Sequence, residues 1–369
     1  MQMKNTRSPF EWDAPYFIGE KTTKIYCFPY CKQKRSTKNN IELKSRKEAE
    51  RTGYQPCKNC CSGLPYGAWK DYGENIKLIV PKEFSFKQNL HYLSRSKNEC
   101  MFHIENNKIY RVVPIEGVNP LIETSIDAEG NIHIRFLGDR APLKKWVRAT
   151  VARYVREWFD LDTDLTPFYA IAKNDVLLSK PIKEYYGLRN MGIPDLFEAL
   201  CWGILGQQIN LTFAYTLKRR FVESFGEYIE WDGRKYWIFP SPEVIANLTV
   251  EDLTKLKMTT RKCEYLIDVA KLITTGSLNK EAFIQIDLKN AEKTLTDIRG
   301  IGPWTANYVL MRCLRCPSAF PIDDVGLHNV IKLLTGSENK PSKKEIREYA
   351  SAWKDWESYA TFYLWRVLY

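Results

Sequence analysis

Two close pairs of cysteines in a weakly apolar segment constrain this chain more than any other feature. The pairs are Cys27-x3-Cys31 and Cys57-x2-Cys60. Residues 1–72 around them are rich in Lys, Asn, Ser and Cys and show little apolar periodicity, so they can hardly fold around a core of their own. Two pairs on tight turns, separated by a longer loop, supply the four thiolates of a tetrahedral Zn²⁺ site. Because a bound metal can supply the missing folding free energy, we predict a small zinc-binding α+β domain with four cysteine ligands.

The overall composition indicates where the protein acts in the cell and what kind of partner it binds. The 369 residues are enough for two or three domains, and no long apolar run suggests a secretion signal or a membrane span. The net charge of +11 favours a polyanionic partner such as nucleic acid. Four histidines without metal-ligand spacing argue against histidine-based metal catalysis. We therefore expect a cytoplasmic, nucleoid-associated monomer that has no membrane partner.

The rest of the chain divides into a mixed segment and a helical segment. Residues 76–173 predict an α+β domain, and residues 178–369 predict an all-α domain. The predicted strands are 76–80, 101–104, 108–113 and 132–136, and a helix follows from Pro142. The predicted helices of the last segment are 197–221, 244–256, 262–275, 288–298, 303–312, 325–334 and 343–365.

The cysteine segment resembles one known family. Thr22-Thr23-Lys24-Ile25-Tyr26-Cys27-Phe28-Pro29-Tyr30-Cys31 and Tyr54-Gln55-Pro56-Cys57-Lys58-Asn59-Cys60 are similar to the zinc-binding motifs of the Ada methyl phosphotriester repair proteins. The resemblance covers roughly residues 9–62. It implies that Cys27 is both a zinc ligand and the nucleophile that accepts a methyl group, once only, from a methylated DNA phosphate. Flanking phosphates would be held by basic side chains, namely Lys24, Lys32, Lys34 and Arg35.

A second constellation lies in the helical segment, in the stretch Leu295-Thr296-Asp297-Ile298-Arg299-Gly300-Ile301-Gly302-Pro303-Trp304-Thr305-Ala306. A helix ends at Gly300, a Gly-Ile-Gly turn follows, and a new helix begins at Pro303. The free N–H groups at the start of that helix can bind a phosphate. We interpret the stretch as a helix-hairpin-helix that contacts the DNA backbone through Gly300, Ile301, Gly302 and Thr305, and whose carbonyls hold a monovalent cation (Na⁺ or K⁺).

The hairpin and the downstream stretch Phe320-Pro321-Ile322-Asp323-Asp324 resemble the HhH-GPD superfamily of DNA glycosylases. Gly206-Gln207-Gln208 and Trp356-Glu357-Ser358-Tyr359-Ala360 narrow the resemblance to the AlkA-type 3-methyladenine DNA glycosylases, over about residues 76–369. It implies a TBP-like α+β fold for residues 76–173. It also implies that Asp324 is the catalytic carboxylate and that Asp323 is a helix-capping neighbour.

The same resemblance assigns further roles. Bifunctional members carry a lysine where Trp304 stands, so a monofunctional glycosylase is expected. Trp304, Tyr308 and Trp365 match aromatic positions of the base pocket, although core packing explains each of them about as well. Gln208 matches the residue that fills the gap left by an extruded base, and a solvent-exposed helix-end glutamine is its alternative.

Both halves point to the repair of alkylated double-stranded DNA. We predict an Ada-type zinc domain at 1–72, an AlkA-type N-terminal domain at 76–173 and a helical glycosylase domain at 178–369. The expected enzyme is a type II DNA-3-methyladenine glycosylase, and stoichiometric methyltransferase activity is a further hypothesis. Two alternatives stay open: a zinc domain that only binds DNA, and a non-catalytic sensor of DNA damage.

Overall fold

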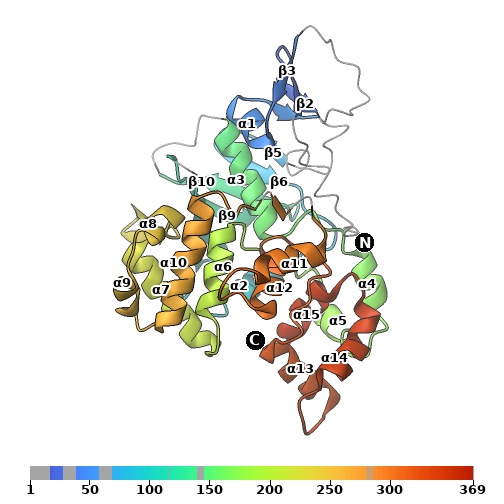
Figure 1. The fold of residues 1–369 in the computed structure, drawn as a ribbon. Coiled ribbons are helices and arrows are strands. Elements are labelled where there is room, and N and C mark those ends of the chain that lie inside the picture. The colour runs from blue at the N-terminus through green and yellow to red at the C-terminus, as the bar shows by residue number, and fades with distance from the viewer. Residues whose placement is uncertain are drawn as a thin grey trace.

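The structure is a computed structural model that describes residues 17–27, 39–57, 69–115, 117–138, 145–280, 282–283 and 286–368. Figure 1 shows a small sheet at the top, a larger sheet below it and a set of helices around and beneath that sheet. Among the helices in these ranges, none combines the length and the apolar character needed to cross a membrane.

The small sheet places the first predicted zinc ligand of each cysteine pair: Cys27 ends its strand β2, and Cys57 directly follows its strand β4. Its strands are β1 (Phe17–Glu20), β2 (Ile25–Cys27), β3 (Asn40–Leu43) and β4 (Gln55–Pro56), in the order β3-β1-β2-β4. The helix α1 (Arg46–Arg51) packs beside them. Among the described residues of this part, a separate core of seven buried residues is formed by Phe17, Tyr26, Cys27, Leu43, Ala49, Tyr54 and Cys57. Such a core is small, as the shortage of apolar residues predicted.

The larger sheet is antiparallel throughout and has the order β5-β6-β10-β9-β8-β7. Its strands are β5 (Trp69–Asp71), β6 (Asn75–Leu78), β7 (His103–Glu105), β8 (Lys108–Val112), β9 (Leu121–Ile126) and β10 (Ile132–Phe136). The predicted strands 76–80, 101–104, 108–113 and 132–136 correspond to β6, β7, β8 and β10. The strand β9 was not predicted, because Glu123 interrupts its apolar pattern; this carboxylate is buried and accepts from Arg135 (2.8 Å) and Lys108 (3.1 Å).

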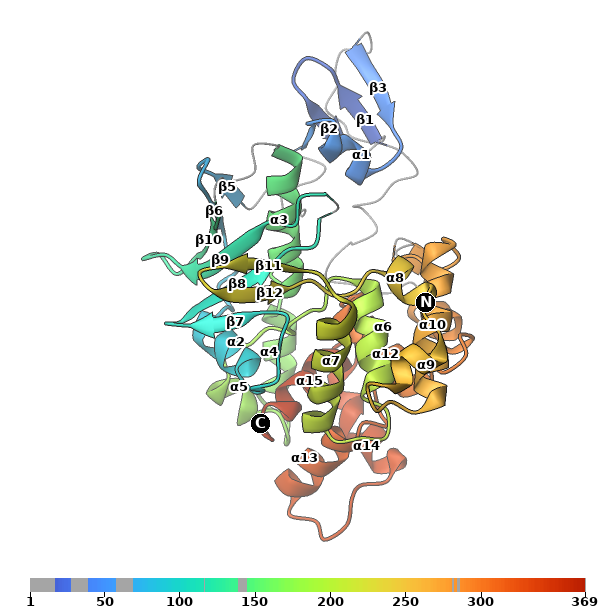
Figure 2. The same cartoon turned by 90° about the vertical axis from the view of Figure 1, so that its left-hand side faces the viewer.

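Two helices pack with this sheet, α2 (Phe86–Leu93) and α3 (Lys145–Trp158). The helix α1 contacts α3, so the small sheet lies against the end of that helix in both views (Figure 1, Figure 2). Trp69 of β5 is packed against the small core and against the large core. Since β5 pairs with β6, the predicted domain boundary at residues 72–76 does not coincide with the edge of the larger sheet.

The last segment is mainly helical. Its helices are α4 (Thr166–Ala172), α5 (Pro181–Glu184), α6 (Leu196–Leu205), α7 (Leu211–Phe225), α8 (Pro242–Ala246), α9 (Val250–Thr254), α10 (Thr260–Thr274), α11 (Leu288–Thr296), α12 (Pro303–Arg312), α13 (Val325–Thr335), α14 (Lys343–Ala350) and α15 (Glu357–Trp365).

Several predictions for this segment need correction. The expected helix 197–221 is two helices, because Gly206 ends α6 and the Asn210 side chain caps α7. The expected helix 343–365 is likewise broken, into α14 and α15. The segment is not all-α, since β11 (Tyr228–Trp231) and β12 (Arg234–Trp237) form an antiparallel hairpin that lies beside β8.

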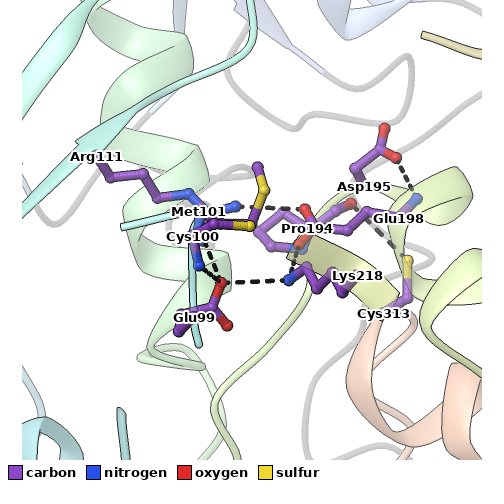
Figure 3. Close-up of polar contacts among 9 residues, drawn as sticks. All are labelled: Glu99, Cys100, Met101, Arg111, Pro194, Asp195, Glu198, Lys218 and Cys313. Carbon is purple, nitrogen blue, oxygen red and sulfur yellow. Dashed lines mark hydrogen bonds and ion pairs between the residues drawn. The ribbon is translucent and has the colours of Figure 1, made fainter. Parts of the chain in front are cut away.

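The larger sheet and the helices share one continuous core, and buried charges join them (Figure 3). Arg111 of β8 pairs with Glu198 of α6 (3.3 Å), and Lys218 of α7 pairs with Glu198 (3.1 Å) and Glu99 (3.5 Å). Burial lowers the pKa of Lys218, but Glu99 and Glu198 raise it, and the net pKa lies above its ordinary value. Because breaking such a buried network is costly, it holds the two parts together beneath the site.

Candidate active site and DNA-binding surface

The carboxylate of Asp324 is held by three N–H donors. Asp324 is the N-cap of α13, and its Oδ1 accepts from the Leu327 backbone N–H at 2.8 Å. The indole Nε1 of Trp365 donates to the same oxygen at 2.8 Å, and the indole Nε1 of Trp304 donates to Oδ2 at 2.8 Å. An ionised carboxylate is an acceptor only and can take all three bonds. The side chain stays partly exposed, so a ligand can reach it.

Three helices converge to build this arrangement. Pro303 opens α12 and places Trp304 in its first turn, while Trp365 ends α15. Gly326 makes room between them: a Cβ at this position would lie 2.9 Å from Asp324 Oδ1 and 3.4 Å from the Trp365 indole. Only a residue without a side chain leaves both groups where they are.

The two adjacent aspartates differ in the structure, and one expectation about them was wrong. Asp323 does not cap α13; it is exposed and pairs with Lys343 at 2.5 Å. Asp324 makes the cap itself, as the φ and ψ angles and the bond from Leu327 show. The structure thus separates a solvent-exposed carboxylate from a positioned one.

Aromatic rings extend from the carboxylate into the protein. The Trp304 and Tyr308 rings are stacked, with centroids 5.5 Å apart and an interplanar angle of 28°. Tyr308 and Trp365 have centroids 6.3 Å apart at 32°. The three predicted pocket aromatics thus lie in one row beside Asp324, Trp304 partly exposed and Tyr308 and Trp365 buried.

Sequence reasoning missed the residues behind Tyr308. Arg312, one turn further along α12, donates to the Tyr308 hydroxyl at 3.0 Å and to the Tyr92 hydroxyl of α2 at 3.1 Å. Burial raises the pKa of Tyr308, so its hydroxyl is neutral and keeps a proton to donate. The spacing of Tyr308 and Arg312 is a signal that could have been found, whereas the contribution of Tyr92 depends on the tertiary fold.

The hairpin joins α11 to α12 through the predicted Gly-Ile-Gly turn. Gly300 has φ +87°, and a Cβ there would lie 2.3 Å from the Tyr265 ring, so both conformation and space require glycine. Ile301 is buried and anchors the turn, whereas Gly302 is exposed and no side chain caps the N-terminus of α12. The first N–H groups of α12 are thus available to a phosphate.

The turn between α6 and α7 lies against this hairpin. The Gln207 Nε2 donates to the Gly300 carbonyl at 2.8 Å and lies 3.3 Å from the Thr305 hydroxyl. Thr305 is only 2% exposed, so its side chain lies inside the hairpin, and the DNA contact predicted at this residue stays a prediction. Gln208 is exposed and has φ +56°, at the tip of the turn. Both alternatives for Gln208, a side chain that enters DNA and a solvent-exposed glutamine, fit this position.

The structure brings together one cysteine from each predicted zinc pair. The strands β2 and β4 are parallel, with Ile25 opposite Gln55 and Tyr26 opposite Pro56. Cys27 and Cys57 come next along the two segments, 4% and 1% exposed, and the Cys57 N–H donates to the Tyr26 carbonyl at 2.8 Å. Cysteines at neighbouring positions of two paired segments fit half of a four-thiolate site.

The remaining predicted groups of this domain divide into two classes. Lys24 is exposed, and its ammonium lies 4.6 Å from the centre of the Tyr54 ring. The other groups of the predicted metal and phosphate sites lie outside the described residues: Cys31, Cys60, Lys32, Lys34 and Arg35. Within the ranges that the structure describes, no group of three or more His, Cys, Asp or Glu side chains is arranged to hold a metal.

Family comparisons cover all three parts of the chain. Residues 2–62 match the metal binding domain of Ada, and residues 77–200 match the N-terminal domain of 8-oxoguanine DNA glycosylase. Residues 201–355 match the HhH-GPD superfamily of base excision DNA repair proteins. A solved structure, a 3-methyladenine DNA-glycosylase from Archaeoglobus fulgidus, shares the fold with a TM-score of 0.67 and 24% identity, over 79% of this chain and 97% of that one.

Curated relatives are more similar in sequence. A DNA-3-methyladenine glycosylase of Bacillus subtilis is 55% identical over 301 residues, which are 82% of this chain and 99% of that protein. DNA-3-methyladenine glycosylase 2 of Escherichia coli is 34% identical over 179 residues, 48% of this chain and 60% of that protein. The recognised motifs, the shared fold and this identity agree, and the chain belongs to the DNA-3-methyladenine glycosylase family, here with an Ada-type metal-binding domain at its N-terminus.

Proposed function

We propose that the chain is a monofunctional DNA glycosylase that hydrolyses the N-glycosidic bond of alkylated bases in double-stranded DNA. The observation that carries the proposal is the Asp324 carboxylate, held by Trp304, Trp365 and Leu327 beside a row of aromatic rings. The 55% identity to a DNA-3-methyladenine glycosylase supports the substrate class.

The proposed role of Asp324 is electrostatic. Cleavage of the glycosidic bond builds positive charge on the sugar, and a fixed carboxylate beside it stabilises that charge without having to reorganise. The stacked faces of Trp304 and Tyr308 suit flat, electron-poor alkylated bases, partly by cation–π attraction. Because an indole occupies position 304, no amine is available there for a Schiff base, and the product is an abasic site.

The proposed DNA contacts follow from the hairpin. The N–H groups at the start of α12 bind a backbone phosphate, and the backbone carbonyls of the turn suit a monovalent cation. Gln208, exposed at its turn, fills the gap that the extruded base leaves. The net charge of +11 favours binding of the negatively charged DNA, independently of its sequence.

Release of 3-methyladenine and 7-methylguanine from methylated duplex DNA tests the proposal, with wild type and Asp324→Asn side by side. Asparagine caps a helix about as well as aspartate, so folding should persist. Loss of the charge should reduce release at least about a hundredfold. Equal release by both proteins would remove Asp324 from the mechanism, and no release by the wild type would favour a damage sensor.

For the N-terminal domain we propose a Zn²⁺ site made by Cys27, Cys31, Cys57 and Cys60, supported by the match to the Ada metal-binding domain and the adjacent Cys27 and Cys57. Bound Zn²⁺ would keep the sulfurs deprotonated. The Cys27 sulfur would then attack the methyl carbon of a methyl phosphotriester: an S–C bond forms, the C–O bond breaks, and the phosphodiester anion leaves.

Mass spectrometry of the full chain after exposure to methyl-phosphotriester DNA tests this transfer. One added methyl group on Cys27 would establish it, and a limit of one methyl group per protein would mark it as stoichiometric and not catalytic. DNA binding without the adduct would favour the alternative, a zinc domain that only binds DNA.

A further inference from the structure

The turn between α6 and α7 holds a strained backbone in place. Gln208 adopts φ +56°, in the left-handed region that non-glycine residues seldom occupy. The residue is exposed, so its own side chain does not stabilise this conformation by burial. Contacts with neighbouring elements must therefore fix the turn. One such contact is made by a residue of the turn, and another by the residue that directly precedes it.

The first contact comes from the hairpin and the second from α10. On one side, Gln207 Nε2 donates to the Gly300 carbonyl at 2.8 Å. On the other side, the Lys262 ammonium donates to the Leu205 carbonyl at 2.8 Å. Leu205 is the last residue of α6 and directly precedes the turn. The turn is thus clamped between α10 and the helix-hairpin-helix.

Lys262 occupies an unfavourable place for a lysine. It is only 8% exposed, and no carboxylate among the described side chains forms an ion pair with it. It is also the third residue of α10, near the positive end of that helix dipole. Burial lowers its pKa. The compensating group is the Leu205 carbonyl at the negative end of α6.

A buried cation without an anionic partner reduces folding stability, and a methionine of similar length would pack there at lower cost. The contact with Leu205 is therefore better explained by what it fixes than by stability. It fixes the end of α6, and hence the direction in which Gln207 and Gln208 leave the helix.

We propose that Lys262 is a positioning residue for the entry of a side chain into DNA. Through its bond to the Leu205 carbonyl, it orients the Gly206–Gln208 turn toward the duplex. This inference rests on the proposed function, in which Gln208 enters the gap beside an extruded base. Lys262 itself touches no substrate. Without it, the turn keeps its anchor on Gly300 but loses the support from α10.

The test uses the full chain and a duplex that carries a tetrahydrofuran abasic analogue opposite 2-aminopurine. Insertion of a side chain into the gap changes the stacking of 2-aminopurine and hence its fluorescence, independently of base release. We expect Lys262→Met to bind this duplex within about threefold of wild type by fluorescence anisotropy, yet to lose most of the 2-aminopurine signal. Single-turnover release of 7-methylguanine should fall about tenfold, as for loss of a hydrogen bond from a charged group.

Two comparisons separate positioning from general damage. Lys280 donates to the Pro194 carbonyl at 2.7 Å and to Glu157 at 3.0 Å, away from the turn. Lys280→Met therefore also removes a bond from a lysine to a carbonyl, and it should keep the full signal. Gln208→Ala should lose the signal, and Lys262→Met should add nothing further in that background. Thermal unfolding checks that each variant folds.

Several outcomes would overturn the inference. Lys262→Met with the full fluorescence change, or with a loss that adds to that of Gln208→Ala, would show that Lys262 does not act through the turn. If Lys262→Met does not fold, Lys262→Gln serves with the same two expectations, because its shorter side chain also loses Leu205. A wild type that gives the signal but releases no base would contradict the proposed enzyme and leave the insertion intact.

Discussion

The metal-binding domain and the candidate active site of the helical part position their functional side chains in opposite ways. Asp324 receives donors from α12, α13 and α15, and these helices belong to a core shared with the larger sheet. Cys27 and Cys57 are placed by a single pair of short strands over a core of seven residues. Tertiary packing organises the first site before any ligand binds, whereas we expect the second to depend on its metal for organisation.

This contrast explains why the two halves should respond differently to the same perturbation. The B. subtilis relative aligns over 99% of its length with 82% of this chain, so that protein has no counterpart for the rest. We therefore expect the helical part to need little from the metal domain. The metal domain, by contrast, packs against the rest of the chain through Trp69 and through the contact of α1 with α3.

The largest expected effect is metal removal. Chelation of the full chain, or Cys57→Ser, should unfold the small sheet, because a structural Zn²⁺ contributes about 10–16 kcal/mol and the core is small. Hydrogen exchange over residues 17–57 measures the loss, and release of alkylated bases should stay within about twofold of wild type. Protection that survives in a metal-free protein would show that packing organises this half too.

The next effect concerns the two indoles. Trp304→Phe and Trp365→Phe each remove one donor from Asp324, and a hydrogen bond to a charged group is worth about 1.5–3 kcal/mol. Release of 7-methylguanine should fall roughly tenfold to a hundredfold in each variant. Trp353→Phe is the matched control. The Trp353 indole also donates to a carboxylate, that of Asp175 at 2.9 Å, but it makes no bond to Asp324. Equal losses in all three variants would indicate general destabilisation and not loss of preorganisation.

A smaller effect is expected from Gly326→Ala. The new Cβ would lie 2.9 Å from Asp324 Oδ1, so the carboxylate must shift by a few tenths of an ångström. Release should fall about tenfold, as expected when a catalytic group is slightly misplaced. The melting temperature should not fall, because alanine favours a helix more than glycine does. Unchanged release would mean that Asp324 tolerates displacement, and the contrast between the two halves would weaken.

The smallest expected effect is that the stabilities of the helical part and of the metal domain change in opposite directions with pH. Burial raises the pKa of Glu357, in the first turn of α15, to about 7. A carboxyl whose folded pKa is raised stabilises the protein fully below its ordinary pKa and loses this contribution as pH rises through 7. Thermal stability of the helical part should drop by on the order of 1–2 kcal/mol between pH 5 and 8, with partial exposure of the group taken into account.

The metal domain should respond in the other direction, because its thiolates must be deprotonated to bind metal and lose it as pH falls. Glu357→Gln should flatten the pH response of the helical part and leave that of the metal domain unchanged. Differential scanning calorimetry from pH 5 to 8, with zinc content measured in parallel, tests both halves in one experiment. Parallel pH profiles would contradict the comparison.

Local patterns in the sequence specified much of the scaffold. The helix 303–312 and the strand 132–136 have the predicted bounds, because a proline at N1 and strict alternation are strong local signals. The helix 197–221 was wrong because apolar periodicity continues through the reversal at Gly206, although Asn210 is a recognisable cap. The hairpin β11–β12 was missed inside a helical context, where Asp232-Gly233 was the available turn signal.

The sequence by itself determined the types of site: four cysteines at metal spacing, a Gly-Ile-Gly hairpin and an aspartate after a proline-rich turn. These are properties of short segments, where spacing and backbone conformation suffice. The family resemblance already singled out Asp324. Only the tertiary structure showed that Trp304 and Trp365 donate to it from two different helices, and that Lys262 contacts the end of α6 beside the turn of Gln208. Such contacts depend on how helices distant in sequence pack together, and no local pattern encodes that packing.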